Sequence, residues 1–279
     1  MIACPTVEKS VIRFHYDLST VFYRLLWGRH IHHGLWHADE SPRIAQQQLT
    51  ETLSSLAAIR KGDRVLDVGC GMGASSIFLA REYQCQVTGV TLSRLQRLWA
   101  GWDSVWAGVW NKTQFRRTDA EQLEYSPQSF DVVWSIECTE HLFDKPAFFR
   151  RAAQLLKPGG RIAICAWLAG NEPLQNDQQQ LVYDVCEGFY CPSLGSQSDY
   201  IGWMEEAALT IQESHDWTEK VAETWEICKR RVRKSGVRAL ARLVDRDTVL
   251  FLDRFETILQ AYRTGAMKYG CFVATRPES

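Results

Sequence analysis

The chain has 279 residues, of which 46% are hydrophobic and 23% charged, and these ordinary globular proportions exclude a largely disordered chain. Its 32 basic and 33 acidic side chains give a net charge of −1, which provides no overall attraction to nucleic acid or to anionic lipid. The nine cysteines are irregularly spaced and form no CxxC pair, which indicates buried thiols in a reducing compartment and not a disulfide framework.

The first sixty residues are expected to form helices. Apolar and aromatic residues are dense over 7–26, and a second apolar pattern with helical spacing covers 42–59. Ser41 before Pro42 predicts an N-cap followed by proline at the first helical position. Residues 1–19 carry charges and lack an apolar signal core, and no uncharged run reaches the length of a membrane span. We therefore expect a soluble, cytoplasmic protein with no integral membrane segment.

Short β-rich runs and helical runs alternate over residues 61–170. Strands are expected at 64–68, 86–90, 114–117, 130–135 and 161–167, and helices at 74–83, 93–106 and 145–156. Helices then predominate over 171–263, with strands near 209–217 and at 269–275. This order predicts an α/β fold: a doubly wound, Rossmann-like, mostly parallel seven-stranded sheet with N-terminal helices and a helical cap. We divide this single compact unit into a lid (1–60), a cofactor-binding core (61–170) and a cap with the final strands (171–279).

A glycine-rich turn follows the first strand of the core. Asp67 lies in that strand, and Gly69, Gly71 and Gly73 open the next helix, where glycines let the backbone approach a ligand closely. The spacing GxGxG differs from the GxGxxG of nicotinamide dehydrogenases and disfavours that class. The segment DVGCGMG resembles motif I of the class I S-adenosylmethionine-dependent methyltransferases. The resemblance implies that the Asp67 carboxylate supports the loop and the methionine end of S-adenosylmethionine.

Further segments match this family in its order over roughly residues 60–170. The turn at 118–120 is similar to the family's adenine-binding step. The strand at 130–134 is similar to its fourth strand, and the turn at 156–160 to the turn before its fifth strand. The second strand departs from the pattern, since Thr91 stands where a ribose-binding carboxylate is usual. The resemblance places the following residues beside the cofactor: Thr91, Leu92, Gln96, Asp119, Ala120 and Ile136.

The pattern TLSxxQ narrows the resemblance to γ-tocopherol methyltransferase-like enzymes and cyclopropane fatty acid synthases. The strings at 15–36 and 186–217 resemble the former, and His32-His33-Gly34 replaces the Ser-Cys pair of the latter. The resemblance implies that Tyr16 is a lid tyrosine over the cofactor. It also implies methyl transfer to a small-molecule acceptor. We expect a few aromatic side chains of the cap to line an apolar pocket, which favours an apolar aromatic or terpenoid acceptor. The candidates are Phe189, Tyr190, Tyr200, Trp203, Trp217 and Trp225.

Candidate catalytic groups follow the fourth strand, where a doubly wound sheet places its ligands. His141 is a candidate base near neutral pH, or a structural histidine that caps the next helix. Glu140 and Glu137 are candidates for orienting that histidine or contacting the acceptor. A lipid cyclopropane synthase, which would use Glu140, and a non-catalytic cofactor-binding protein remain as alternatives. The acceptor, its methylated atom and the oligomeric state stay open.

Two charged or polar clusters are expected to be incidental. Histidines at 15, 30, 32, 33 and 37 lack an accompanying cysteine or carboxylate ligand pattern, so no metal site is expected. The basic run 229–234 has no interleaved aromatics. It is interpreted as the solvated face of a helix, with a docking patch for an acidic partner or a membrane as the alternative.

Overall fold

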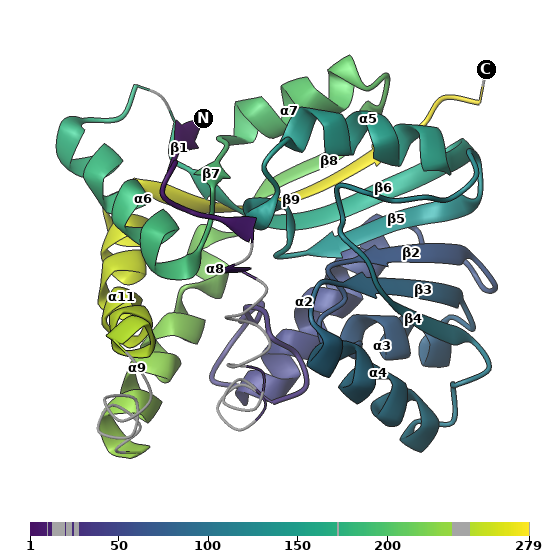
Figure 1. Ribbon diagram of the computed structural model, residues 1–279, viewed down its shortest axis with the longest axis horizontal. Helices are drawn as coiled ribbons and strands as arrows, with labels where there is room; N and C mark the ends of the chain where they lie inside the picture. Colours follow the sequence, from purple (N-terminus) through teal and green to yellow (C-terminus); the bar gives the residue numbers. More distant parts are fainter. Residues whose placement is uncertain are drawn as a thin grey trace.

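One seven-stranded sheet organises the molecule (Figure 1). The computed structural model describes residues 1–9, 11–12, 20, 24, 28–171, 173–235 and 246–278, without the side chains of 233–235 and 246–253. The strand order is β4 (Thr113–Arg117), β3 (Gln86–Thr91), β2 (Arg64–Val68), β5 (Phe130–Ile136), β6 (Leu156–Ala169), β9 (Met267–Thr275) and β8 (Thr210–Asp216). The first five are parallel, and β9 runs antiparallel to both its neighbours. The predicted fold class is confirmed.

Helices cover both faces of the sheet, which explains why its central strands are buried throughout. On one side lie α5 (Lys145–Leu155) and α7 (Gln197–Glu206), and on the other α2 (Pro42–Leu56), α3 (Ala74–Glu82) and α4 (Arg94–Trp106) (Figure 1). Successive residues of β2 alternate between two apolar cores, because a strand points its side chains to opposite faces. Val65 joins one core and Leu66 the other.

Local signals in the sequence set most helix ends. Ser93 caps α4 by accepting from the Gln96 amide, and Asp144 caps α5 by accepting from Ala147. Ser41 precedes α2 as expected, but its side chain makes no capping hydrogen bond. That helix ends at Leu56, earlier than predicted, because Ala58 turns to a positive φ of 46° and the chain leaves the helix there.

The segment 156–160 was expected to be a turn before the fifth strand, and this prediction was wrong. Strand β6 already begins at Leu156, which pairs with Phe130 of β5. The register between the two strands shifts after Phe130, and Gly159 has a φ of +69°. The chain therefore departs from the extended conformation at Gly159, and regular pairing resumes at Arg161, opposite Val132.

The remaining elements are mostly helical, as predicted for 171–263. They are α6 (Asn176–Phe189), α8 (Thr218–Val221), α9 (Glu223–Ser235) and α11 (Arg246–Arg263), with the two-residue strand β7 (Ser193–Leu194). Strand β7 pairs with β1 (Ile2–Ala3) and so attaches the N-terminus to this region. Most of the helix predicted over 7–26, and Tyr16 with it, lies outside the described residues. The boundaries of lid, core and cap remain predictions.

Two further features bear on the sequence-based expectations. All nine cysteines are free thiols, and all but Cys138 are buried. Within the described ranges, no helix combines the length and apolarity that a membrane span requires.

Candidate active site

A pocket opens where the parallel strands β2, β3 and β5 end, the usual ligand position of a doubly wound sheet. It brings together ten of the predicted site residues: Gly69, Gly71, Thr91, Leu92, Gln96, Asp119, Ala120, Ile136, Glu137 and His141. Asp67, Gly73 and Glu140 do not line it. The lining is completed by residues that the sequence did not single out, among them Lys9, Ile12, Ile31, Glu121 and Leu142.

The glycine turn forms one wall of this pocket. Gly69, Gly71 and Gly73 all have positive φ angles, of 76°, 52° and 78°. A Cβ atom at Gly69 would lie 2.3 Å from Cys138 Cβ, whereas one at Gly71 would meet no atom within 4 Å. The backbone at Gly71 therefore borders open space, and a nucleoside cofactor can approach it closely, as the resemblance to methyltransferases requires.

Asp67 lies in the strand before this turn and bonds to the helix after it. Its side chain is buried and accepts a hydrogen bond of 2.5 Å from the hydroxyl of Ser76, in the first turn of α3. Burial raises the pKa of Asp67 to about 7, although the hydrogen bonds from Ser76 act in the opposite direction. The carboxyl group thus joins β2 to α3, and it lies outside the pocket lining.

The turn between β3 and α4 is closed by its own side chains. The Thr91 hydroxyl donates to Gln96 Oε1 at 2.8 Å, and both side chains are buried. The carbonyl of Thr91 also accepts from the Thr118 amide. The hydroxyl that was expected to meet the ribose is therefore engaged within the chain, and its role toward a ligand stays a prediction.

A cluster of charges spans the pocket where Asp119 and Ala120 lie. Lys9 Nζ is 2.8 Å from Asp119 Oδ2 and also pairs with Glu121. Glu121 accepts from the amides of Phe143 and Asp144. Partial burial lowers the pKa of Lys9, but the hydrogen bonds to both carboxylates outweigh it and raise the value above its ordinary range. Lys9 thus ties the N-terminal segment to the pocket, and no sequence motif indicated it.

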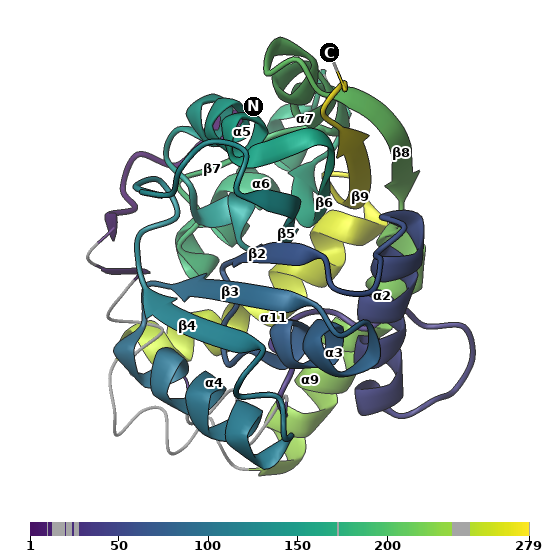
Figure 2. The same cartoon turned by 90° about the vertical axis from the view of Figure 1, so that its right-hand side faces the viewer.

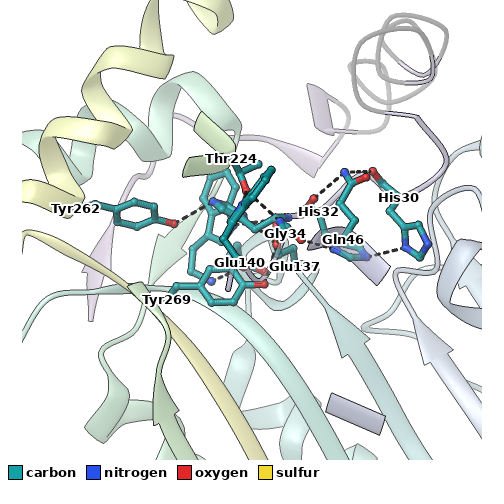
Figure 3. Close-up of polar contacts among 12 residues, drawn as sticks. His30, His32, Gly34, Gln46, Glu137, Glu140, Thr224, Tyr262 and Tyr269 are labelled. Atoms are coloured by element: carbon teal, nitrogen blue, oxygen red, sulfur yellow. Dashed lines mark hydrogen bonds and ion pairs between the residues drawn. The ribbon is translucent and has the colours of Figure 1, made fainter. Parts of the chain in front are cut away.

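Glu137 is an anchoring carboxylate (Figure 3). Its Oε1 accepts from the amide and Nδ1 of His33 and from the Tyr269 hydroxyl, and its Oε2 accepts from Trp167 Nε1. Burial alone would raise its pKa, but the charge and hydrogen bonds of His33 lower it to about 2. A carboxylate with four donors and this pKa is a poor proton acceptor at neutral pH. The expected contact with His141 is replaced by contacts with His33.

The histidine string at 30–33 forms a hydrogen-bonded chain (Figure 3). His32 Nδ1 donates to the carbonyl of His33 at 2.7 Å, so its Nε2 accepts from His30 Nδ1 at 2.9 Å. Gln46 donates to the carbonyls of His30 and His32, and the Tyr262 hydroxyl meets His33 Nε2 at 3.3 Å. These contacts position the segment against α2, α11 and the end of β5.

Glu140 lies in the protein interior behind the pocket. Its Oε1 accepts from the Trp167 amide at 2.5 Å, and in the described part of the chain its buried Oε2 has no partner. Burial raises its pKa to about 8, so the group is largely protonated at neutral pH. Glu140 was expected to orient His141 or to contact the acceptor, but this carboxyl group contacts β6.

His141 lies at the pocket surface in the short helix η1 (Thr139–His141). Its Nδ1 is 3.1 Å from the carbonyl oxygen of Tyr190. Because that oxygen can only accept, Nδ1 carries the proton, and the lone pair of the neutral ring is on Nε2. Burial lowers the pKa of His141 to about 4. The cap of α5 is Asp144, so helix capping is not the role of this histidine.

The aromatic side chains of the cap do not line this pocket, and that expectation was wrong. Phe189 and Trp225 pack edge-on against Trp167, and Tyr200 stacks on Phe272. Their apolar faces are used to attach the cap helices to the sheet. Apolar side chains in the pocket come instead from other segments: Ile12, Ile31, Ile136 and Leu142.

Known proteins resemble the chain over nearly its full length. Residues 5–268 match the family described as mycolic acid cyclopropane synthetase. The chain is 32% identical to the "Probable tocopherol O-methyltransferase, chloroplastic" of Oryza sativa subsp. japonica, over 99% of this chain and 80% of that one. It is 31% identical to the 27-O-demethylrifamycin SV methyltransferase of Amycolatopsis mediterranei, over 94% and 96%.

Solved structures share the fold at lower sequence identity. The [4+2]-cyclase SpnF superposes with a TM-score of 0.86 at 20% identity, over all of both chains. The geranyl diphosphate C-methyltransferase of Streptomyces coelicolor A3(2), crystallised with Mg²⁺, geranyl diphosphate and S-adenosylhomocysteine, gives 0.74 at 20% identity, over 96% and 97%. The family match and the sequence relatives reach beyond fold. The chain belongs to the mycolic acid cyclopropane synthetase family and is a class I methyltransferase that uses S-adenosylmethionine.

Proposed function

We propose that the chain methylates a small, largely apolar acceptor of aromatic or prenylated type. The observation that carries this proposal is a single pocket that holds both the glycine turn and His141 and is lined between them by apolar side chains. The names of relatives support the acceptor class, since they act on tocopherol, demethylrifamycin and geranyl diphosphate.

The proposed cofactor site consists of the two turns that follow β2 and β3. The backbone at Gly69 and Gly71 would face the cofactor, Asp67 and Gly73 would support the turn from behind, and Asp119 with Ala120 would meet the adenine edge. Thr91, Leu92, Gln96 and Ile136 would complete the wall. S-adenosylmethionine supplies, when bound, a methyl group on a positively charged sulfur. Tyr16 remains a proposed lid residue outside the described part of the chain.

His141 is proposed as the base that accepts the proton which the acceptor loses. The contact with the Tyr190 carbonyl holds the ring and leaves the lone pair on Nε2. Because burial lowers the pKa of His141 to about 4, the ring is neutral near pH 7. Glu137 is proposed as a positioning residue, since its four hydrogen bonds hold the pocket wall beside His141.

An acceptor screen tests this function. The purified chain is incubated with S-adenosylmethionine and a phenol, a prenylated phenol, a prenyl diphosphate or a sugar, and products are identified by mass spectrometry. We expect S-adenosylhomocysteine together with a methylated phenol or prenyl compound. Methylation of the sugar alone would contradict the acceptor class, while release of S-adenosylhomocysteine would still agree with the family.

Cyclopropanation of a lipid alkene is a second candidate. It is favoured by the family match and by Glu140, a buried carboxyl group whose Oε2 has no partner in the described part of the chain. An arm of the screen with an unsaturated phospholipid separates the two, because ring formation adds a methylene group and removes the alkene. A cyclopropane product without any methylated acceptor would replace the first proposal by the second.

A further inference from the structure

Helix α4 carries its large apolar side chains on the outside. Trp106 is 80% exposed, Trp102 68% and Val105 61%, and Leu98 and the nearby Trp110 are also exposed. Positions 98, 102, 105 and 106 lie on one face of a helix, since residues three and four apart are neighbours. The opposite face buries Gln96, Ala100, Asp103 and Ser104 against the protein. This exposed face, with Trp110, is called the tryptophan face below.

The fold itself does not need the tryptophan face, because α4 is attached through its small and polar side. A cluster of this kind exposes apolar area to water at a cost in solubility. Scattered exposed apolar residues are ordinary, but contiguous ones mark interaction surfaces. These side chains therefore form a candidate contact surface, and the charges of the same segment indicate the chemistry of a partner.

Those charges are almost all positive. Residues 94–117 contain five cations, Arg94, Arg97, Lys112, Arg116 and Arg117, and one carboxylate, Asp103. Asp103 is buried and already bonded to the guanidinium of Arg24 at 2.7 and 3.0 Å. Among the described residues, none of the five cations forms an ion pair. The chain as a whole has a net charge of −1, so this excess of positive charge is local to α4 and the edge strand β4.

Helix α4 and strand β4 lie side by side at one edge of the molecule (Figure 2). Strand β4 ends the sheet; its Arg117 donates to the Leu92 carbonyl just before α4, whereas Arg116 lies over the ring of Tyr125. The first turn of α4 forms part of the pocket wall through Ser93 and Gln96. Trp106 is ten residues beyond Gln96, or about 15 Å along the helix axis. A partner bound here would lie close to the active site.

We propose that the tryptophan face docks the enzyme on an anionic lipid bilayer. Indole side chains favour the interfacial zone between headgroups and hydrocarbon, and neighbouring arginines are attracted to anionic headgroups. A second copy of this chain is the less suitable occupant. In a two-fold interface the same patch faces itself, so Arg94 and Arg97 of the two copies would meet, while Asp103, the carboxylate of α4, is already bonded to Arg24. The inference does not depend on the acceptor's identity.

The basic run 229–234 is a weaker candidate for such a surface. Lys229 forms an ion pair with Glu256, and Arg230 pairs with Glu223 at 2.7 Å. These partners neutralise part of its charge, and the apolar residue within the run, Val232, is half-buried. The interpretation of this run as a solvated helix face agrees with these contacts.

Vesicle flotation tests the proposal with the full chain. Vesicles of phosphatidylcholine alone are compared with vesicles that also contain phosphatidylglycerol, at low and high sodium chloride. We expect binding to the anionic vesicles that weakens with salt, and quenching of tryptophan emission by brominated lipid. No binding to anionic vesicles at low salt would overturn the proposal.

Variants distinguish docking through this face from unspecific adsorption. Trp102→Ser combined with Trp106→Ser and Trp110→Ser should abolish quenching and reduce binding at least tenfold, while Ile44→Ser, an exposed apolar residue of α2, should not. Arg94→Gln with Arg97→Gln should weaken binding about 30-fold at low salt. Unchanged affinity for S-adenosylmethionine shows that each variant is folded. Equal binding by the triple variant and the native chain would refute membrane docking. A native chain that sediments as a dimer, with a triple variant that sediments as a monomer, would also refute it, because the face would then join two copies.

Discussion

One oxygen of Glu137 accepts both the backbone amide and the Nδ1 of His33, at 2.8 and 3.0 Å. The two residues are 104 positions apart, and this pair joins the N-terminal histidine segment to the end of β5. Glu137 itself has a positive φ of 52°, which turns its side chain away from the strand and toward that segment. The wall of the pocket beside His141 is therefore set by a buried, hydrogen-bonded pair whose carboxylate also contacts β6 and β9.

Glu137→Gln should destabilise the fold by about 2–3 kcal/mol, because an amide cannot accept from donors at both of its ends. The folded-state pKa of about 2 lies below the ordinary 4.5, so the carboxylate stabilises the protein above pH 4.5. This stabilisation, about 3 kcal/mol by linkage, is lost as the pH falls from 4.5 through 2. Urea unfolding across this range measures it, and an equal acid sensitivity of Glu137→Gln would contradict the assignment.

Glu140 should change the pH dependence of folding stability in the direction opposite to Glu137. Its folded-state pKa of about 8 lies above the ordinary 4.5, so folding favours the protonated form, and stability falls as the pH rises from 4.5 to 8. Glu140→Gln imitates the protonated acid and should remove this decline. His141 and Asp67, with pKa values of about 4 and about 7, titrate in both proteins, so their contributions cancel in this comparison. Thermal unfolding of both proteins at pH 6.5 and pH 8 gives the result; parallel curves would exclude a buried neutral Glu140.

Gly71→Arg should abolish binding of S-adenosylmethionine, since the new side chain would enter the open space beside the turn. Calorimetric titration should show at least a 100-fold loss, the order expected when a bulky group displaces a ligand. Gly62→Arg is the matched control, because Gly62 also has a positive φ, also faces open space and does not line the pocket. Similar losses in both variants would attribute the effect to backbone strain.

His141→Ala should lower turnover 10- to 1,000-fold with little change in affinity for S-adenosylmethionine, as expected for removal of a base. His37→Ala, at an exposed histidine, is the control. The activity of the native enzyme should also fall below about pH 4, where His141 becomes protonated. Steady-state rates on the best acceptor of the screen provide the measurement. Unchanged turnover in His141→Ala would assign the proton transfer to another group or to water.

The sequence alone determined the features that depend on neighbouring residues. Strand β2 was predicted at its observed bounds, and α4 to within one residue, because periodicity and capping act over a few positions. The glycine turn was recognisable for the same reason, since its positive φ angles require glycine wherever the chain is folded. These local signals were enough to predict the sheet, the family and most of the pocket wall.

Tertiary structure alone decided which distant groups meet. Lys9 pairs with Asp119, 110 positions away. Glu140 accepts from the Trp167 amide of β6 and not from His141, although Glu140 and His141 are adjacent in the chain. The periodicity of α4 predicted a helix without revealing that Trp102 and Trp106 face outward. Burial and partner choice depend on how the strands are ordered in the sheet, and a pattern of residue types along the chain does not contain the distances that this order creates.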